Sequence, residues 1–491
     1  MQTALQPAID TARERKTLAF LVPLIEKLRG LDSPLKKHQV GAVVVSPTRE
    51  LARQTYTVLQ PFLEDAPELE ANLLVGGRDP LADVTTLQES RASVLVGTPG
   101  RLFDVLERCE FLDFKHLELL ILDEADRVLD MGFRGHIDAI MARLPKQRRT
   151  GLFSATQTDA VEQLARAGLR NPVRVNVAVS AATAPDAANS TPDDPEAARS
   201  ADAVAAAGTT VAGSTAGQRT PTSLQISYML CEPDQKMGQL IRFLQAHRQE
   251  KVIVYMLTCA CVDFWASVLH TLPAASDLVV HALHGRMKQR VRDAKLAAFT
   301  APGPGCLLCT DIAARGLDIP DVSWTVQVDA PQDPDAFVHR VGRSARMGRP
   351  GRGLILLAPS EQPYVKFLLV RKVPVQEQAG VQGVPEVDND SLLAAVRAAS
   401  EGDRDVMEKG TRAFVSYVRA YREHQCRFIF RMEELDLGRL AMAFGLLRLP
   451  RMPELARSKA ITNFTPSSVD LDAIKYKDKT PQARQNKRGG L

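Results

Sequence analysis

Short apolar runs alternate with amphipathic stretches along the first third of the chain. The apolar runs have the length of strands: Val43–Val45, Leu73–Val75, Val94–Val96, Leu119–Leu122 and Thr150–Phe153. Between them, apolar residues recur at helical spacing, for example over Glu50–Leu63 and Asp159–Ala167. Continuous apolar strands are typical of parallel sheets that helices cover on both faces. The pattern therefore predicts a doubly wound α/β domain.

This alternation stops in the middle of the chain and then resumes. From Ala181 to about Pro221 the residues are mostly Ala, Thr, Ser, Pro, Asp and Gly, so we expect a disordered linker. Strand-like runs return at Val252–Tyr255, Leu278–His281, Cys306–Cys309, Val322–Gln327 and Gly353–Leu357. Helical spacing returns with them over Lys236–His247 and Gln289–Phe299. This half predicts a second α/β domain of similar size.

The C-terminal part follows another pattern. Thr411–His424 and Met432–Phe444 have the spacing of amphipathic helices, and Lys475–Leu491 is basic and polar. These changes predict a first domain over 1–178, a disordered linker over 179–221, a second domain over 222–372, a linker over 373–400, a helical extension over 401–465 and a basic tail over 466–491.

The composition fits a soluble protein of more than one domain. The 491 residues exceed the size at which single cores stop growing, and 45% hydrophobic with 24% charged residues excludes general disorder, collagen and coiled coil. No run approaches the ~18 apolar residues of a membrane span, and the N-terminus lacks an apolar signal core. We therefore expect no membrane partner. The net charge of +4 permits a nucleic-acid partner without requiring one.

The cysteines allow three interpretations. Cys306 and Cys309 form a CxxC, which could be half of a zinc site, a redox pair or two buried thiols. The chain has seven cysteines, an odd number, and no second CxxC or histidine pair at zinc-finger spacing. We therefore favour buried thiols in a reducing compartment, either cytosol or nucleus.

An acidic tetrapeptide, Asp123-Glu124-Ala125-Asp126, directly follows the apolar run Leu119–Leu122. Parallel sheets place ligands at the carboxyl ends of their strands. A carboxylate there can hold Mg²⁺ on a triphosphate, as we expect for Asp123, and a second can activate water, as we expect for Glu124. A chance acidic turn in contact with solvent would look the same in isolation.

The tetrapeptide belongs to an ordered series of segments. They are Pro47–Ala52, Gly76-Gly77, Thr98–Arg101, Asp123–Asp126, Ser154–Thr156, His284-Gly285, Gln289 with Arg292, Thr310-Asp311, Ala314–Asp318 and His339–Arg346. In this order they resemble the DEAD-box RNA helicases over about residues 16–360. The resemblance implies an α/β protein with two tandem RecA-like parallel-sheet domains that bind ATP, Mg²⁺ and single-stranded RNA between them.

Residue roles follow from the same resemblance. The implied catalytic set is Asp123, Glu124, Ser154, Thr156, His339, Arg343 and Arg346, in which the two arginines reach the phosphates from the second domain. The implied ATP-binding set is Lys16, Thr17, Gly316 and Asp318, and the implied Mg²⁺ set is Asp123, through ATP, and Thr17. The implied RNA-binding set is Thr48, Arg49, Gly77, Thr98, Gly100, Arg101, Gly285, Arg292 and Thr310. Glycines and arginines of this kind contact the RNA backbone, so no base preference is expected.

The phosphate-binding loop departs from the family. Its eight residues are Asp10-Thr11-Ala12-Arg13-Glu14-Arg15-Lys16-Thr17, so Lys16 and Thr17 remain but arginines replace both glycines. Side chains there obstruct the backbone from wrapping a phosphate. The strand that should lead into this loop is also absent, so the first domain is expected to be incomplete at its N-terminus. Either the gene model is mis-spliced at its 5′ end, which we favour, or the protein has lost efficient ATP binding.

The C-terminal extension narrows the resemblance. Phe414–Tyr421, Phe428–Phe430, Leu435–Gly438 and Ile474–Lys479 resemble a nucleolar subfamily that acts on precursors of the large ribosomal subunit. This implies a monomeric enzyme of the nucleus and nucleolus, with pre-ribosomal RNA and pre-ribosomal particle proteins as partners. The extension could instead only brace the second domain, and both roles are compatible. A non-catalytic RNA-binding scaffold with the helicase fold is the alternative function, since Arg13 and Arg15 replace the glycines.

Overall fold

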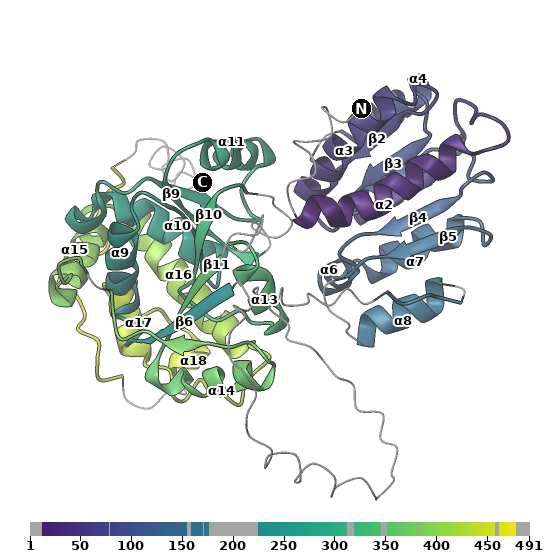
Figure 1. The fold of residues 1–491 in the computed structure, drawn as a ribbon. Helices are drawn as coiled ribbons and strands as arrows, with labels where there is room; N and C mark the ends of the chain where they lie inside the picture. The colour runs from purple at the N-terminus through teal and green to yellow at the C-terminus, as the bar shows by residue number, and fades with distance from the viewer. Residues whose placement is uncertain are drawn as a thin grey trace, which may run out of the picture.

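Two α/β lobes lie side by side in the computed structural model (Figure 1). It describes residues 12–77, 79–154, 159–169, 171–175, 224–311, 319–344, 351–381, 383–456 and 461–477. Within these ranges the first lobe contains a five-stranded sheet and the second a seven-stranded sheet. The expected two-domain α/β fold is confirmed. The linker predicted over 179–221 lies outside the described residues. No helix of the described part of the chain is long and apolar enough to cross a membrane.

The first sheet has the order β2-β3-β1-β4-β5, and all its strands are parallel. The strands are β1 (Ala42–Val45), β2 (Ala71–Leu74), β3 (Val94–Gly97), β4 (Leu119–Leu122) and β5 (Arg149–Leu152). The helices are α2 (Ala12–Arg29), α3 (Arg49–Glu64), α4 (Pro80–Glu89), α5 (Pro99–Arg108), α6 (Ala125–Asp130), α7 (Arg134–Arg143) and α8 (Asp159–Gly168). Each strand agrees with the prediction to within two residues, because apolar runs buried on both faces are a strong signal.

Strand β5 differs from the other strands of this sheet. Strands β1, β3 and β4 are buried along their whole length, whereas β5 is exposed at Arg149 and half-buried over its remaining residues. It is also the edge strand beside β4. An edge strand leaves a row of backbone donors and acceptors without sheet partners. Among the described residues, no strand pairs with the outer edge of β5.

The second sheet has the order β12-β6-β11-β10-β7-β9-β8. Its strands are β6 (Leu224–Leu230), β7 (Lys251–Tyr255), β8 (Val280–Leu283), β9 (Gly305–Cys309), β10 (Val322–Gln327), β11 (Gly351–Leu357) and β12 (Gln376–Glu377). The helices around it are α9 (Lys236–Ala246), α10 (Cys259–Val268), α11 (Gln289–Thr300), α13 (Asp335–Val341) and α14 (Pro363–Val370). The sequence did not identify β6 and β12, and it placed β8 two residues too early.

Helices α15 (Asn389–Gly402), α16 (Arg404–Arg422), α17 (Leu437–Ala443) and α18 (Pro453–Ala456) form the C-terminal extension. The linker predicted over 373–400 is wrong, because β12 and most of α15 lie within it. Helix α16 begins earlier than expected, where the Asp403 side chain caps it by accepting from the Asp405 amide. Helix α17 begins later than expected, since Asp436 caps it in the same way. The extension shares one hydrophobic core with the second sheet.

The cysteines confirm the structural interpretation. All seven are free, and Cys306 and Cys309 are buried in β9. Burial in an apolar environment raises the pKa of both thiols, which keeps them protonated and unreactive. The described residues contain no group of three His, Cys, Asp or Glu side chains that could hold a metal ion. A zinc or redox role for this CxxC therefore has no support.

Candidate functional site

The acidic segment lies at the carboxyl end of β4, where the sheet geometry holds Asp123 in place. The Asp123 amide donates to the Val45 carbonyl at 2.9 Å, and its Oδ1 accepts from the Glu124 amide at 2.9 Å. Lys16, from the first turns of α2, places its Nζ 3.1 Å from the same Oδ1. Thr17 is buried beside it in the chain. The structure therefore brings together Lys16 and Asp123, which lie 107 positions apart in the chain.

Glu124 has a left-handed backbone conformation, with φ 47° and ψ 54°. A residue with a Cβ adopts this region at a cost of about 1–3 kcal/mol, and such residues concentrate at functional sites. Its Oε2 lies 2.8 Å from Nη1 of Arg127, which is almost wholly buried. The strained turn and the ion pair together fix where the Glu124 carboxylate lies at the start of α6.

Ser154 follows β5 at the same edge of the sheet. Strand β5 pairs with β4 in register, Leu122 opposite Leu152, and the Phe153 carbonyl accepts from the Ala125 amide at 2.9 Å. Ser154 is therefore one residue beyond a direct backbone contact with the acidic segment. Thr156, the other predicted residue of this segment, lies outside the described residues.

Helix α13 of the second domain approaches the acidic segment from across the domain boundary. His339 Nε2 lies 3.8 Å from Asp126 Oδ2, and Arg343 Nε donates to the His339 carbonyl at 3.2 Å. Burial and the nearby Arg127 guanidinium lower the pKa of His339 to about 4, so its imidazole is neutral at neutral pH. The predicted residues Gly316, Asp318 and Arg346 lie outside the described residues.

The sequence analysis gave no role to Arg340, which lies in the last turn of α13. Its Nε and Nη2 donate to the two carboxylate oxygens of Asp311 at 2.6 and 2.8 Å. Nη1 donates to the Gln327 side chain and to the Asp329 carbonyl, and the guanidinium stacks over Tyr255. Two parallel hydrogen bonds from a guanidinium to a carboxylate fix the orientation of both groups and also strengthen their interaction. Arg340 thus anchors the helix that carries His339.

A second contact joins α3 of the first domain to α11 of the second, which lie toward each other in Figure 1. Arg292 Nη2 lies 2.8 Å from Glu50 Oε1, and Gln289 Nε2 donates to the same oxygen at 3.1 Å. Arg49 Nη1 donates to Gln289 Oε1 at 3.1 Å. Glu50 had no predicted role, although it lies inside the motif that contains Arg49. Gln289 and Arg292 have the spacing of neighbours on one helix face, and this was the feature of the sequence that could have indicated the contact.

Arg49 explains why glycines occupy positions 76 and 77. A Cβ on Gly76 would lie 2.9 Å from Arg49 Nη2, and one on Gly77 would lie 2.8 Å from Nη1. Gly77 also has a φ of +99°, which residues with a Cβ rarely adopt. Burial and the nearby charge of Arg292 lower the pKa of Arg49. The two predicted RNA-binding elements, Arg49 and Gly77, are therefore adjacent in space.

The other predicted RNA-binding residues of the first domain lie at the ends of β1 and β3. Thr48 caps α3 by accepting from the Leu51 amide, and Thr98 is the residue before α5. A Cβ on Gly100 would meet no atom within 4 Å, so the surface there is open. Arg101 is instead buried, with Nη1 3.2 Å from Asp83 Oδ2. A direct RNA contact remains a prediction for each of them, and Arg101 would have to leave Asp83 to make one.

In the second domain, Gly285 follows a buried histidine. His284 Nε2 lies 2.8 Å from Asp263 Oδ1. Burial opposes protonation of His284, but hydrogen bonds to Asp263 and Cys259 outweigh it and raise its pKa to about 9. The imidazolium thus places a positive charge next to Gly285 at neutral pH. The hydroxyl of Thr310, at the end of β9, is buried and finds no hydrogen-bond partner among the described residues.

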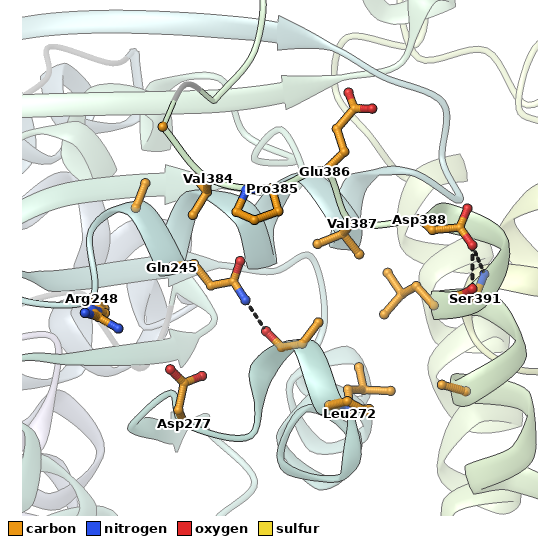
Figure 2. A pocket seen from close by; sticks show the side chains of 16 residues that line it. Gln245, Arg248, Leu272, Asp277, Val384, Pro385, Glu386, Val387, Asp388 and Ser391 are labelled. Carbon is orange, nitrogen blue, oxygen red and sulfur yellow. Dashed lines mark hydrogen bonds between the residues drawn. The ribbon is translucent and has the colours of Figure 1, made fainter.

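A separate pocket of about 710 Å³ lies between the end of α9 and the segment before α15. Figure 2 shows Gln245, whose side chain donates to the Ala274 carbonyl at 2.6 Å, below Val384 and Pro385. Asp277 and Arg248 also line this pocket. None of the residues that line it belongs to the motif series. The pocket is therefore distinct from the site between the domains.

Comparison with known families shows the family to which the chain belongs. The DEAD/DEAH box helicase family matches residues 16–164, and the helicase conserved C-terminal domain matches residues 235–348. DEAD-box ATP-dependent RNA helicase 18 of Arabidopsis thaliana is 48% identical over 476 residues, which cover 96% of this chain and 75% of that protein. The chain belongs to the DEAD-box RNA helicase family. In this DEAD-box protein the family match begins at Lys16. The expected loop over Asp10–Thr17 is wrong at Arg13 and Arg15, because both lie within α2, which begins at Ala12.

Other comparisons extend the likeness of this DEAD-box protein to the C-terminal extension and the fold. Residues 403–452 match the C-terminal extension of the ATP-dependent rRNA helicase SPB4-like family. ATP-dependent RNA helicase DDX55 of Homo sapiens is 43% identical over 478 residues, covering 96% of this chain and 73% of that protein. The DEAD-box helicase Mss116, in a structure bound to single-stranded RNA and UDP-BeF, has the same fold with a TM-score of 0.70 at 24% identity, over 90% of this chain and 83% of that one.

Proposed function

We propose that this chain is an ATP-dependent RNA helicase that remodels RNA during maturation of large-subunit ribosomal RNA. The observation that carries the proposal is the approach of His339 in the second domain to 3.8 Å from Asp126 in the first. An acidic segment and an arginine-bearing helix that meet in this way can act together on a ligand bound between the domains. Closure of the domains then couples that ligand to a second one.

The acidic end of β4 suits the Mg²⁺ form of ATP. Hard cations prefer carboxylate and hydroxyl oxygens, which Asp123 and Thr17 offer, and the Lys16 ammonium at 3.1 Å from Asp123 suits a phosphate. Bound ATP with Mg²⁺ would supply the phosphoryl group that is transferred to water. Glu124 would orient that water and accept its proton. Arg343, together with Arg346, would stabilise the negative charge that develops.

The RNA-binding surface would extend over both domains. Gly100 leaves the surface open to a phosphate, because a Cβ there would meet no atom within 4 Å, and Gly77 and Gly285 are the other proposed glycines. The imidazolium of His284 adds positive charge beside Gly285. Thr48, Arg49, Thr98, Arg101, Arg292 and Thr310 complete the proposed set. Because such contacts read the backbone, the affinity should fall with salt and vary little with base sequence.

The extension supports a ribosomal substrate. Its match to an SPB4-like rRNA helicase extension covers all of α16 and α17. On this basis we infer pre-ribosomal RNA and pre-ribosomal particle proteins as partners, a monomeric state and a nuclear, nucleolar location. As domain limits we propose 1–178 and 222–372 for the two RecA-like domains, with the extension beginning at α15 rather than at residue 401.

A non-catalytic RNA-binding scaffold is the second candidate. One observation favours it: Arg13 and Arg15 stand where a phosphate-binding loop has glycines. A scaffold would keep the RNA surface and domain contacts while binding ATP poorly. The preserved acidic segment, with its strained Glu124, weighs against it.

The test compares RNA binding with RNA-stimulated phosphate release and with unwinding of a short RNA duplex. The chain as written is expected to bind ATP weakly, so a chain with Arg13→Gly and Arg15→Gly should be measured beside it at several salt concentrations, each with its Asp123→Asn variant. Turnover that needs RNA and disappears in the variant supports the helicase. RNA binding with no turnover in either chain supports the scaffold. Absence of both RNA binding and turnover contradicts both proposals.

A further inference from the structure

Helix α16 of the C-terminal extension reaches the carboxyl ends of two neighbouring strands of the second sheet. The Ser416 hydroxyl donates to Thr258 Oγ1 at 2.6 Å, and the Tyr417 hydroxyl donates to Asp329 Oδ1 at 3.1 Å. Thr258 lies three residues after β7 and Asp329 two residues after β10, and β7 and β10 pair with each other. Adjacent residues of the extension therefore contact the edge of the sheet where parallel α/β domains form their sites.

Asp329 joins this extension to the catalytic domain through both its side chain and its backbone. The carboxylate is buried and accepts from Tyr417 and from the Leu257 amide at 3.1 Å, with Lys236 Nζ at 3.8 Å. Its carbonyl accepts from Arg340 Nη1 at 2.7 Å. Burial raises the pKa of Tyr417 well above its usual value, so its hydroxyl remains a donor at neutral pH.

Arg340 carries the connection onward to the domain boundary. It lies on α13 directly after His339, which approaches Asp126 of the first domain. Its other donors bind Asp311 and the Gln327 side chain, so the Asp329 carbonyl supplies one of the contacts that fix the guanidinium. The Tyr417 hydroxyl is therefore separated from α13 by a single residue, Asp329.

We propose that Tyr417 is a positioning residue of the helicase site: its hydroxyl holds Asp329, and through it Arg340, so that α13 presents His339 and Arg343 to the first domain. The consequence for catalysis rests on the function proposed above, whereas the effect on α13 does not. In this view the C-terminal extension is part of the ATPase apparatus and does more than brace the domain.

The bracing role can be separated from the positioning role. Bracing depends on apolar packing of α16, in which Phe414 and Val418 are wholly buried against the core of the second domain. Tyr417→Phe keeps the ring and this packing but removes the donor to Asp329. Among the described residues, Asp329 Oδ1 then keeps only the more distant Lys236 Nζ at 3.8 Å, so the carboxylate is held less firmly. The loss falls on Asp329 and its backbone rather than on the apolar contacts.

The matched control is Tyr476→Phe. The Tyr476 hydroxyl donates to Glu408 Oε1 at 2.7 Å, so this variant removes the same kind of bond from the same helix. The hydrogen bond between Tyr476 and Glu408 is distant from Asp329, because Glu408 lies about two turns before Tyr417 on α16. Val418→Ala is the second control, because it destabilises α16 through packing alone.

The first readout is amide hydrogen exchange in α13, measured in the full chain without nucleotide or RNA. Tyr417→Phe should speed exchange over residues 335–344 about fivefold or more, whereas Tyr476→Phe should leave it unchanged. Val418→Ala should speed exchange in α16 without the selective effect on α13. Exchange in α13 that is the same in Tyr417→Phe and wild type, or that rises equally in Val418→Ala, would overturn the proposal.

The second readout is RNA-stimulated phosphate release. Tyr417→Phe should lower kcat about fivefold or more and leave the KM for ATP and the Kd for single-stranded RNA within twofold, at a melting temperature no lower than that of Val418→Ala. If Val418→Ala lowers kcat to the same extent as Tyr417→Phe, the proposal is wrong and Tyr417 has only a bracing role. Because the chain as written is expected to turn over near background, this second readout is taken in the chain with Arg13→Gly and Arg15→Gly. Should that chain show no turnover even with Tyr417 in place, the proposed enzyme fails, and the exchange of α13 still decides the role of Tyr417.

Discussion

Arg292 of the second domain forms an ion pair with Glu50 of the first, and the two side chains are only 12% and 8% exposed. Gln289 donates to the same Glu50 oxygen, so this carboxylate receives two donors from one face of α11. An arginine that the sequence assigned to RNA is therefore held by the protein itself. In this arrangement, Arg292 contributes to domain docking and could reach RNA only together with Glu50.

Glu50→Gln should weaken docking of the two domains. The variant removes the charge that pairs with Arg292 and leaves a poorly solvated guanidinium, at a cost of about 1–3 kcal/mol, or roughly 5- to 150-fold in the closure equilibrium. Energy transfer between one dye on each domain, with poly(U) RNA and a non-hydrolysable ATP analogue at millimolar concentration, measures the closed fraction. An unchanged closed fraction would show that the Glu50 contact does not contribute to closure.

Arg53→Gln is the control for this prediction. Arg53 Nη1 lies 3.0 Å from Asp293 Oδ2 in the same interface, but the two side chains are 36% and 39% exposed. Exposed ion pairs contribute about 0–1 kcal/mol. The equilibrium constant for closure should therefore change by less than about fivefold. The comparison separates the effect of a buried charge from that of an exposed charge at the same interface.

The elements that sequence predicted well are those with a strong local signal. Strands β1, β3 and β4 are apolar on both faces, so their position is evident without a partner. Strand β12 is two exposed residues, Gln376 and Glu377, which only the pairing with β6 makes a strand. Helix α15 carries small and polar residues, and its burial depends on packing against α16 and α17. Tertiary context, rather than local pattern, defines these elements.

The functional site likewise combines features that a local sequence pattern predicts with features that only tertiary contacts define. Because carboxyl ends of parallel strands meet at one edge, the sequence was sufficient to place Asp123 and Ser154 near each other. It gave no way to pair Glu50 with Arg292 or Arg340 with Asp311, since no periodicity connects residues so far apart. Tyr417 was identified only as part of an amphipathic helix. Its hydroxyl bond to Asp329 depends on how the extension docks, which the helix pattern does not encode.

The chain as written should bind ATP weakly. Arg13 and Arg15 replace the glycines whose backbone would wrap the phosphates, and Lys16 and Asp123 remain as the main contacts in the first domain. We expect little heat in isothermal titration with ATP and Mg²⁺, and phosphate release near background even with RNA. Single-stranded RNA should still bind, with an affinity that falls as salt rises.

A pair of double variants separates loop geometry from charge. Arg13→Gly with Arg15→Gly should tighten ATP binding, whereas Arg13→Lys with Arg15→Lys, which keeps both the charge and the Cβ atoms, should not. Micromolar ATP affinity and strong RNA-stimulated turnover in the unaltered chain would show that the glycines are dispensable.

Glu124→Gln should separate ATP binding from hydrolysis in the chain with the restored glycines. The amide keeps the size of the side chain but cannot accept a proton from water, so turnover should fall by about 100-fold or more. ATP and RNA affinities should stay within about threefold. Glu118→Gln is the control, because Glu118 forms only a half-exposed pair with Lys27 on the same domain. Equal turnover in Glu124→Gln and wild type would remove Glu124 from the mechanism.

Docking of the domains should weaken as the pH falls below about 6.5. Four charged groups face His339: Arg127 and Arg343 oppose its protonation, and Asp126 and Glu124 favour it. Burial and Arg127 prevail, which lowers the pKa to about 4 in the docked form. In the undocked form the imidazole contacts water and has its ordinary pKa near 6.5. The undocked form therefore binds more protons between pH 6.5 and 4, and acid favours it.

The sign of this effect distinguishes two descriptions of the contact between His339 and Asp126. If His339 is neutral, the closed fraction is highest above pH 6.5. Below that pH the equilibrium constant for closure falls by up to about tenfold per pH unit. A protonated histidine paired with Asp126 predicts the opposite trend, since its pKa would be raised. Energy transfer between the domains from pH 7.5 to 5, with RNA and the ATP analogue, measures the slope. His339→Asn should remove the slope, because asparagine does not titrate in this range. A closed fraction that rises as the pH falls would show that the charge of Asp126 prevails over burial and Arg127.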